Sequence, residues 1–316
     1  MIIVGKWTIY LIFLMRNSEI KKGETGKMFE KVVRKKAKLR MALTGVSGAG
    51  KTLSALYIAY GITGDWSKIA LIDTEHERAR LYANRSDLGT GEFLYAPFEP
   101  PYSPMRYKEY VLQGALAVGS DGVVIVDSFT HAWNNEGGVL DIKEQISKQS
   151  GKNSYTAWFE AGKEQNNLVN TILAVDCHTI VTMRSKMDYA MQENDKGKMQ
   201  PVKMGLAPIQ REDTEYEFDI VLDIARNHVA TASKDTTFLD KFGAVITPEL
   251  GVQLKEWLDN GVEPDRCETC GKTILAKNGK SEQNIIEASM KYLNKKCCYD
   301  CFAKEYREMK AINNVQ

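Results

Sequence analysis

The sequence lacks a strong net charge, a hydrophobic run long enough to cross a membrane, and any internal repeat. Its 316 residues carry 42 Lys and Arg against 41 Asp and Glu, a formal net charge of +1, so no overall field favours nucleic acid as a partner. The apolar stretch from Met1 to Met15 is shorter than the roughly 20 residues that span a bilayer. We therefore expect neither a transmembrane segment nor a membrane partner. The sequence also has no low-complexity tract, and its 43% hydrophobic and 26% charged residues are typical of an ordinary globular protein.

Cysteine is scarce over most of the chain. Only Cys177 precedes residue 267, and the other five cysteines lie in the last 50 residues. Disulfide frameworks belong to small secreted domains, so a cluster at one end of a long chain favours metal binding instead. Cys177 lies within the apolar run 172–181, where we interpret it as a small buried hydrophobic residue.

The first 40 residues hold an uneven share of positive charge, eleven Lys and Arg against three Glu. Their basic run at residues 34–38 either contacts phosphate backbones or is a solvated approach to the first strand. The apolar stretch before it carries the single lysine Lys6, and no small-residue cleavage site follows, which disfavours a secretory signal. We expect a cytoplasmic protein whose translation starts at Met15 or Met28.

Residues 38–258 alternate short apolar runs with segments of helical periodicity. The expected strands are 38–44, 69–73, 93–96, 122–127 and 178–183, and the expected helices are 51–60, 107–118, 158–173 and 251–258. Strands that are apolar throughout and alternate with helices predict a mostly parallel sheet between helices, an α/β fold. Two later runs, 218–225 and 228–233, flank Arg226-Asn227 and predict an antiparallel hairpin with a two-residue turn.

The α/β pattern ends at a linker marked by Asn260-Gly261 and Pro264. We therefore divide the chain into a basic N-terminal extension at residues 1–37, an α/β core at 38–263, and a small C-terminal module at 264–316.

One glycine-rich segment between the first expected strand and the first expected helix fits G-x-x-x-x-G-K-[ST] at every position. It reads Gly45, Val46, Ser47, Gly48, Ala49, Gly50, Lys51 and Thr52. Glycines let backbone N–H groups surround phosphate oxygens, the lysine neutralises the β- and γ-phosphates, and the threonine hydroxyl binds Mg²⁺. The segment predicts a site for ATP and Mg²⁺ in which Lys51 also assists catalysis.

Two acidic positions follow strands that should end at the same edge of the sheet. Asp127 ends the apolar run 123–126, where a carboxylate can hold Mg²⁺ through water; capping of the next helix is the alternative. The run 69–73 leads into Thr74-Glu75-His76, where a carboxylate would lie beside the γ-phosphate and could orient or deprotonate the attacking water.

These residues carry a family resemblance. Residues 72–76 resemble the segment of RecA-type recombinase ATPases that holds the catalytic glutamate, and the match places that role on Glu75. Asp127-Ser128 resembles the Mg²⁺-binding strand end of the same family, and residues 217–224 look like the strand after its second DNA-binding loop. The resemblance covers about residues 38–258 and implies a RecA-like P-loop NTPase core in which Asp73 has a positioning role.

The sequence departs from recombinase RecA in two respects. No separate N-terminal polymerisation domain is visible, so long filaments are not expected. The position after the fifth strand reads Thr182-Met183-Arg184 in place of the family's Asn-Gln pair, so sensing of the γ-phosphate falls to either Arg184 or Gln210. Lys234 matches a basic residue that reaches the nucleotide of a neighbouring subunit. This match implies a homo-oligomer with a catalytic Lys234, and a surface lysine is the alternative.

Finer detail resembles phage-encoded RecA-like ATPases that are linked to single-strand annealing recombination or replication. The segments that carry this resemblance are residues 99–104, 128–133, 182–186 and 205–211. It implies the cytoplasm of a host cell as the location and a phage recombination or replication protein as a partner.

Residues 184–211 occupy the place of a DNA-binding loop in RecA-type proteins. They include six basic residues, which are Arg184, Lys186, Lys196, Lys198, Lys203 and Arg211. The segment either contacts single-stranded DNA, with Tyr189 as a stacking surface, or forms a solvated loop or hairpin that contacts the next subunit.

The C-terminal cysteines form two C-x-x-C pairs, Cys267 with Cys270 and Cys298 with Cys301. Each pair can supply two corners of a tetrahedral Zn²⁺ site, and four thiolates leave no open position, so we expect a structural metal. Unpaired redox-active thiols are the alternative. Cys297 could replace Cys298 as a ligand, although only Cys298 completes a C-x-x-C pair.

A helix is predicted at residues 282–293, in the spacer between the two cysteine pairs. A four-cysteine tail of this form also resembles the tails of phage recombination-associated proteins, which implies a role in binding DNA or a partner.

We therefore predict a Mg-dependent RecA-like ATPase that acts on single-stranded DNA as an oligomer. The alternative is an ATP-driven switch that recruits another protein through residues 184–211 and the cysteine module without contacting DNA. A small-molecule P-loop kinase is disfavoured, because no acceptor-binding lid or phosphate-binding arginine cluster is recognisable.

Overall fold

The computed structural model describes residues 32–193 and 199–313, so Met15 and Met28 lie outside the described residues. The described chain divides into two compact units, residues 37–259 and residues 260–313 together with 32–36. In this part of the chain no helix has both the length and the apolar character needed to cross a membrane.

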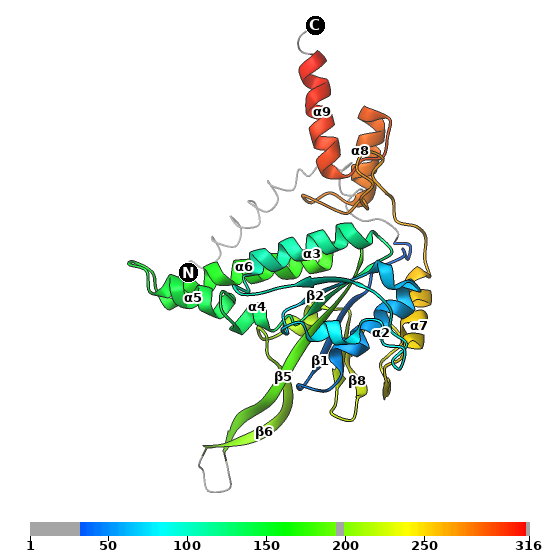
Figure 1. The fold of residues 1–316 in the computed structure, drawn as a ribbon. Helices are drawn as coiled ribbons and strands as arrows, with labels where there is room; N and C mark the ends of the chain where they lie inside the picture. The colour runs from blue at the N-terminus through cyan, green and yellow to red at the C-terminus, as the bar shows by residue number, and fades with distance from the viewer. Residues whose placement is uncertain (1–31, 194–198, 314–316) are drawn as a thin grey trace, which may run out of the picture. The chain divides into compact units, whose positions relative to one another are not determined.

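The larger unit is built on a mostly parallel sheet with the strand order β3-β2-β4-β5-β1-β7-β8-β9, and β6 pairs with β5 outside this path. Strands β1 to β5 and β7 run parallel, whereas β8, β9 and β6 are antiparallel to their neighbours (Figure 1). This sheet confirms the predicted α/β class. The strands are β1 (Arg40–Gly45), β2 (Ile69–Asp73), β3 (Leu94–Pro97), β4 (Val123–Asp127), β5 (His178–Glu193), β6 (Met199–Pro208), β7 (Ile220–Ile224), β8 (Val229–Asp235) and β9 (Gly243–Val245).

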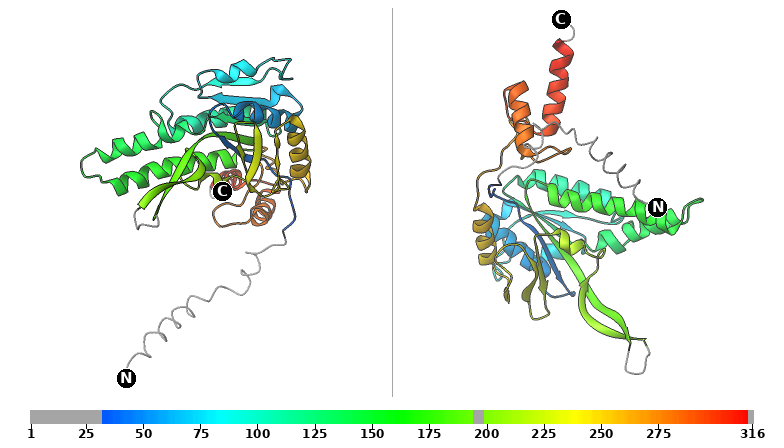
Figure 2. Two further views of the ribbon diagram at one scale, coloured as in Figure 1. Left: turned by 90° about the horizontal axis from the view of Figure 1, so that it is seen from below. Right: turned by 180° about the vertical axis from the view of Figure 1, so that it is seen from behind.

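Helices cover both faces of the sheet because its central strands are apolar on both sides. Successive side chains of a strand point to opposite faces, so Met41 and Leu43 of β1 pack with α2 and α7, while Ala42 packs with α3 and α6 (Figure 2). The helices of this unit are α2 (Lys51–Thr63), α3 (Pro104–Val118), α4 (His131–Asn134), α5 (Val139–Ser147), α6 (Ser154–Ala174) and α7 (Pro248–Asp259), with short 3-10 helices η2 (Trp66–Lys68), η3 (Arg78–Tyr82) and η4 (Thr214–Glu217).

Helices α2 and α7 approach closely because glycines meet at their contact. A Cβ atom on Gly61 would lie 1.9 Å from the carbonyl oxygen of Pro248, and one on Gly251 would lie 2.3 Å from that of Ile58. No side chain fits at either glycine, so the two backbones touch. Helix α7 also adds three buried leucines to this core, Leu250, Leu254 and Leu258.

The hairpin between β7 and β8 has a longer connection than predicted. The Ala225 N–H donates to the carbonyl oxygen of Val229 at 2.9 Å, which leaves the three residues 226–228 in the loop. His228 adopts a left-handed conformation with φ of 64°, as in three-residue hairpin loops that end in a bulge. The predicted two-residue turn at Arg226-Asn227 is therefore wrong.

The fifth strand is also longer than predicted. Strand β5 continues past Met183 to Glu193 and pairs with β6, so the described part of residues 184–211 is largely a β-hairpin that projects from the sheet (Figure 1). Lys196 and Lys198 lie outside the described residues. Apolar periodicity stops at Met183 because the strand leaves the core there, which is why the sequence predicts its end too early.

The smaller unit contains α8 (Glu282–Leu293) and α9 (Tyr299–Asn313), and the predicted helix at residues 282–293 is confirmed. Ile274, Ile285 and Ile286 pack with two of the cysteines in a small core. Residues 32–36 belong to this unit, since Lys35 pairs with Val262 in a parallel bridge.

Candidate active site

The glycine-rich loop joins β1 to α2 at the carboxyl edge of the sheet. Gly45, Gly48 and Gly50 have φ values of 154°, 80° and 93°, which side chains rarely allow. A Cβ atom on Gly45 would also lie 2.5 Å from the carbonyl oxygen of Ile224, so glycine is required there on two grounds. The loop ends at the N-terminus of α2, where free N–H groups and the helix dipole favour an anion.

Lys51 points back into this loop. Its Nζ donates hydrogen bonds to the carbonyl oxygens of Gly45 at 2.9 Å and Val46 at 3.0 Å, and the residue is buried. Burial lowers the pKa of the Lys51 ammonium, and the charges of Asp127 and Glu75 oppose that shift. The ammonium therefore lies against the backbone of the loop, within the field of the Asp127 and Glu75 carboxylates.

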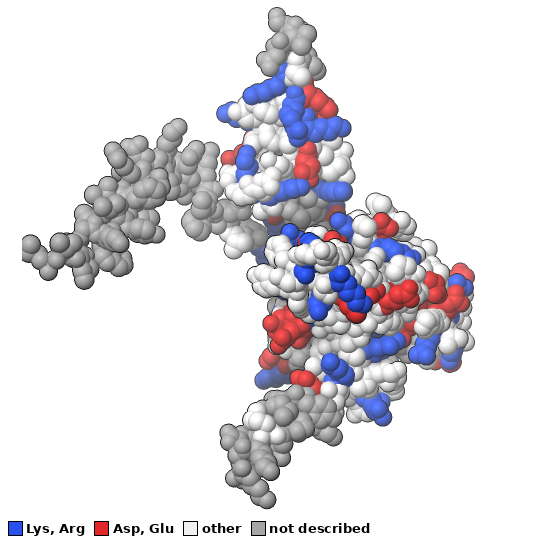
Figure 3. Space-filling model, turned by 90° about the vertical axis from the view of Figure 1, so that its left-hand side faces the viewer, with Lys and Arg blue, Asp and Glu red and all other residues white. Residues whose placement is uncertain are grey.

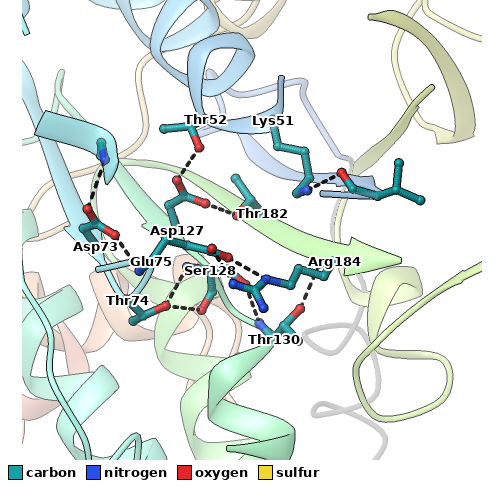
Figure 4. A network of polar contacts seen from close by, with 12 residues as sticks. Lys51, Thr52, Asp73, Thr74, Glu75, Asp127, Ser128, Thr130, Thr182 and Arg184 are labelled. Carbon is teal, nitrogen blue, oxygen red and sulfur yellow. Dashed lines mark hydrogen bonds and ion pairs between the residues drawn. The ribbon is translucent and has the colours of Figure 1, made fainter. Parts of the chain in front are cut away.

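Asp127, the last residue of β4, connects α2 to β5 through its carboxylate. Its Oδ2 accepts a hydrogen bond from Thr52 Oγ1 at 2.6 Å, and its Oδ1 accepts one from Thr182 Oγ1 (Figure 4). Burial raises the pKa of Asp127, and the hydrogen bonds from Thr182 and Thr52 oppose the shift. A hydroxyl and a carboxylate this close offer the hard oxygen ligands that Mg²⁺ prefers.

Glu75 follows β2 and faces Arg184 of β5. Arg184 Nε donates to Glu75 Oε1 at 2.7 Å, and a second guanidinium nitrogen pairs with Oε2 (Figure 4). Burial acts to raise the pKa of Glu75, but the hydrogen bonds and charge of Arg184, together with the charges of His131 and Lys51, outweigh it, so that pKa is lowered. Asp73 holds the backbone of this turn by accepting from the N–H groups of Glu75 at 2.6 Å and Ala79 at 3.1 Å.

The loop, the Thr52–Asp127 contact and the Glu75–Arg184 pair all lie within the part of the chain that matches a known protein family. A protein-family model described as an AAA domain matches residues 37–242, well over half of the chain. This chain belongs to that AAA-domain family. It is a P-loop ATPase, as its sequence predicts.

The AAA-domain ATPase is also similar to a solved structure that is described as an ATPase domain. The two share 10% sequence identity with a TM-score of 0.37, over 83% of this chain and 99% of that chain. No curated protein matches the chain.

The two candidate sensors of this AAA-domain ATPase have different surroundings. Gln210 is buried, accepts from Gln165 Nε2 at 3.0 Å and donates to the carbonyl oxygen of Phe129 at 3.1 Å. Arg184 is partly exposed and its side chain reaches Glu75. Both hydrogen bonds of the Gln210 side chain are thus made within the fold, whereas Arg184 faces the carboxylate that follows β2.

Within one chain Lys234 contacts none of the residues described above. It lies on β8, where it faces Val221 of β7, and its ammonium donates to the carbonyl oxygen of Tyr216. His76 is exposed, beside Glu75 in the same turn.

Three residues of the site were given no role of their own from the sequence. Thr182 binds the Asp127 carboxylate, and Thr130 Oγ1 accepts from the Arg184 N–H at 2.9 Å. His131 is buried with its Nδ1 unpartnered among the described residues, and burial followed by the charge of Arg184 lowers its pKa. Thr182 could be found only from the pairing of the strands. Val181 of β5 lies opposite Val126 of β4, so the next residues of the two strands, Thr182 and Asp127, lie side by side.

The four cysteines of the two C-x-x-C pairs come together in the smaller unit. The sulfur atoms of Cys267, Cys270, Cys298 and Cys301 all lie within 4.8 Å of one another, and those of Cys270 and Cys298 are 3.8 Å apart. A tetrahedral Zn²⁺ with Zn–S bonds of about 2.3 Å requires sulfurs about 3.8 Å apart, so the cluster fits the metal.

Cys297 lies outside this cluster. It is fully buried, its N–H donates to Ser289 Oγ at 3.0 Å, and its sulfur contacts Thr269 Oγ1 at 3.5 Å. The sulfur of Cys298, and not that of Cys297, belongs to the converging set, which favours Cys298 as the fourth ligand.

Burial and the neighbouring sulfurs raise the pKa values of Cys270 and Cys301. Thiolates so close together repel one another, and a bound cation would relieve that repulsion. The chemistry of the cluster thus agrees with its geometry in favouring a metal.

Proposed function

We propose that this AAA-domain ATPase couples Mg-dependent ATP hydrolysis to an action on single-stranded DNA in phage recombination or replication, and that it works as a homo-oligomer. The nucleotide part rests on the convergence of loop, lysine and carboxylates. The DNA part is supported by the path of β5 and by the family resemblance stated above.

ATP binds with its phosphates in the loop of residues 45–50. Backbone N–H groups of Gly48, Ala49 and Gly50, together with the exposed Ser47, surround the phosphate oxygens. Lys51 exchanges its two carbonyl contacts for the β- and γ-phosphates. Loss of Lys51 therefore removes the only ammonium that the described structure places inside the loop.

Thr52 and Asp127 would hold Mg²⁺, because their oxygens lie together beside the start of α2. Bound Mg²⁺ would neutralise charge on the phosphates. Thr182 keeps Asp127 oriented through the second carboxylate oxygen.

Glu75 acts as the general base that orients and deprotonates the attacking water. Asp73 fixes its backbone, and Arg184 helps to lower the pKa of the carboxyl group, which favours the ionised form that a base requires. Lys234 would complete the site of a neighbouring subunit, which requires release of its contact with the Tyr216 carbonyl.

The single observation behind the DNA proposal is that β5 runs unbroken from the site into the projecting hairpin. Thr182 contacts Asp127 and Arg184 pairs with Glu75, and the exposed Lys186 begins the hairpin. If DNA binds the hairpin, a displacement of β5 would move Arg184 and so change the position of the Glu75 carboxylate, which acts on the attacking water. The cysteine module, with a structural Zn²⁺, would add a further contact to DNA or to a partner protein.

Hydrolysis assays with and without single-stranded DNA test this proposal. We expect DNA to stimulate hydrolysis, and the stimulation to weaken steeply with salt because lysines and arginines displace counterions from phosphates. Lys51→Ala should abolish nucleotide binding and hydrolysis, whereas Lys68→Ala, an exposed lysine at the end of η2, should behave as the wild type. Full activity of Lys51→Ala would contradict the nucleotide site.

A second candidate function is an ATP-driven switch that binds another protein without DNA. The hairpin favours it in one respect, because Met187, Met199 and Leu206 expose large apolar side chains, which suit a protein surface. If DNA does not stimulate hydrolysis and does not bind at low salt, the result favours this candidate over the first.

A further inference from the structure

Exposed aromatic rings concentrate on the first turns of α6. Tyr155, Phe159 and Trp158 are 82%, 61% and 43% exposed. Trp133 from the end of α4 stacks on Trp158 with a centroid distance of 6.1 Å and an interplanar angle of 25°. None of these four rings belongs to the two buried clusters of the core, so packing within the fold does not account for them.

Two lysines lie against these rings. Lys143 Nζ of α5 is 5.3 Å from the ring centre of Trp158, and Lys163 Nζ is 4.2 Å from that of Phe159. Both distances are those of cation–π contacts. Within the described residues neither ammonium forms an ion pair, so both charges are available to an anionic partner.

The other charges nearby largely cancel. Two further lysines are neutralised by glutamates, in the pairs Lys148–Glu144 and Lys152–Glu160. Figure 3 shows this side of the molecule, where basic, acidic and uncharged surface alternate. What distinguishes the surface is the rings with two lysines that form no ion pair among the described residues, rather than a general positive field.

We propose that this aromatic–lysine patch (Tyr155, Trp158, Phe159, Lys143 and Lys163) binds single-stranded nucleic acid by stacking bases on its rings. The inference rests on the proposed action on single-stranded DNA and adds a second contact surface to the β5–β6 hairpin. Helix α6 leads back into β5, so its first turns lie toward the edge at which β4 ends and from which the hairpin projects (Figure 1).

The ligand class follows from the chemistry of the patch. Aromatic rings that reach solvent can stack with any base, because every base has a π-face, and the ammonium groups that lie against them can neutralise the connecting phosphates. A duplex keeps its bases stacked on one another and offers no free face to such rings. The patch should therefore prefer single strands to duplexes and show little sequence preference.

Fluorescence anisotropy of a labelled oligothymidylate at low salt tests the inference with the full chain. Trp158→Ala and Phe159→Ala should each weaken binding by roughly 5- to 150-fold, the range of base–aromatic stacking. Tyr216→Ala, which removes an exposed ring on η4, should leave the affinity unchanged. The double variant Lys143→Gln with Lys163→Gln should lower the slope of log affinity against log salt by about one to two.

Each outcome has one meaning. A wild-type chain that binds no oligonucleotide overturns the proposed function and this inference with it. Wild-type binding that is unchanged in Trp158→Ala and Phe159→Ala overturns the inference alone. If these variants keep full DNA affinity but lose self-association in sedimentation, the patch is an interface between copies of the chain. Far-UV circular dichroism and an unchanged midpoint of urea unfolding verify that the variants are folded.

Discussion

Because Glu75 pairs with Arg184, the Glu75→Gln substitution should have a large effect on the rate of hydrolysis and a small effect on the free energy of unfolding. Glu75→Gln keeps the shape of the side chain but removes the charge that receives two hydrogen bonds from the guanidinium. General-base catalysis contributes about 10²- to 10⁴-fold, which corresponds to about 3–5 kcal/mol of the barrier. Hydrolysis should fall by that factor, while nucleotide affinity changes by less than about threefold because the phosphates are held elsewhere.

The cost of the same change to stability should be much smaller. The side chains of Glu75 and Arg184 are 15% and 38% exposed. Hydrogen bonds between charged groups contribute about 1.5–3 kcal/mol when desolvated, and solvent around Arg184 screens the pair toward the lower values of exposed ion pairs. We expect a coupling of about 1 kcal/mol between Glu75→Gln and Arg184→Gln in a double-mutant cycle measured by urea unfolding.

The Arg184→Gln variant also carries a pH prediction. In the wild type the guanidinium lowers the pKa of Glu75 against the effect of burial. Without Arg184 the effect of burial remains, so that pKa rises. A general base must be deprotonated, and activity is lost as pH falls through its pKa, so the acidic limb of the kcat profile should move to higher pH.

Single-turnover hydrolysis of radiolabelled ATP, measured across pH, provides the assay for the Glu75→Gln and Arg184→Gln variants. His76→Asn is the matched control, because His76 is exposed, lies next to Glu75 and has a left-handed φ of 57° that asparagine tolerates. A Glu75→Gln enzyme that hydrolyses ATP within threefold of the wild type would refute the assignment of the base. An acidic limb that does not move in Arg184→Gln would refute the electrostatic role of the arginine.

Three other predictions concern the rest of the chain. The purified protein should contain about one Zn²⁺ per chain, lost in the double variant Cys267→Ser with Cys270→Ser, as measured by plasma mass spectrometry; a metal-free wild type would contradict the zinc assignment. Specific activity should fall on dilution if Lys234 acts on a neighbouring subunit, and a constant value down to nanomolar protein would oppose that role. Burial lowers the pKa of His178 to about 3, so its neutral form stabilises the fold fully above pH 6.5 and less as pH falls. At pH 5 the loss should reach about 2 kcal/mol, and His178→Asn should show a correspondingly smaller drop in unfolding free energy between pH 7.5 and 5.

Local signals account for the parts of the fold that could be predicted. Strand β2 at residues 69–73 and helix α8 at residues 282–293 have the expected bounds, because continuous apolar runs and helical periodicity are properties of adjacent residues. The loop of residues 45–52 was predictable for the same reason, since its glycines, lysine and threonine stand in one short segment.

Contacts between distant residues were beyond such signals. The hydrogen bond from Thr182 to Asp127 and the ion pair from Arg184 to Glu75 depend on the order of strands in the sheet, which local periodicity does not specify. A hairpin was one of two alternatives for residues 184–211, but the extension of β5 past Met183 was not predicted, because the strand leaves the core there and its apolar pattern stops. The sequence does not predict the patch at the start of α6, because aromatic residues in a helix usually indicate burial, whereas here they are exposed.

The meeting of α2 and α7 at two glycines sets a limit on how far the protein can be shortened. The family match ends at residue 242, before α7 begins at Pro248. A recombinant fragment that ends at residue 242 would lack α7. The face of α2 that packs with Leu254 would then be exposed to water. Studies of the isolated ATPase should therefore place the C-terminal boundary after Asp259, where α7 is complete.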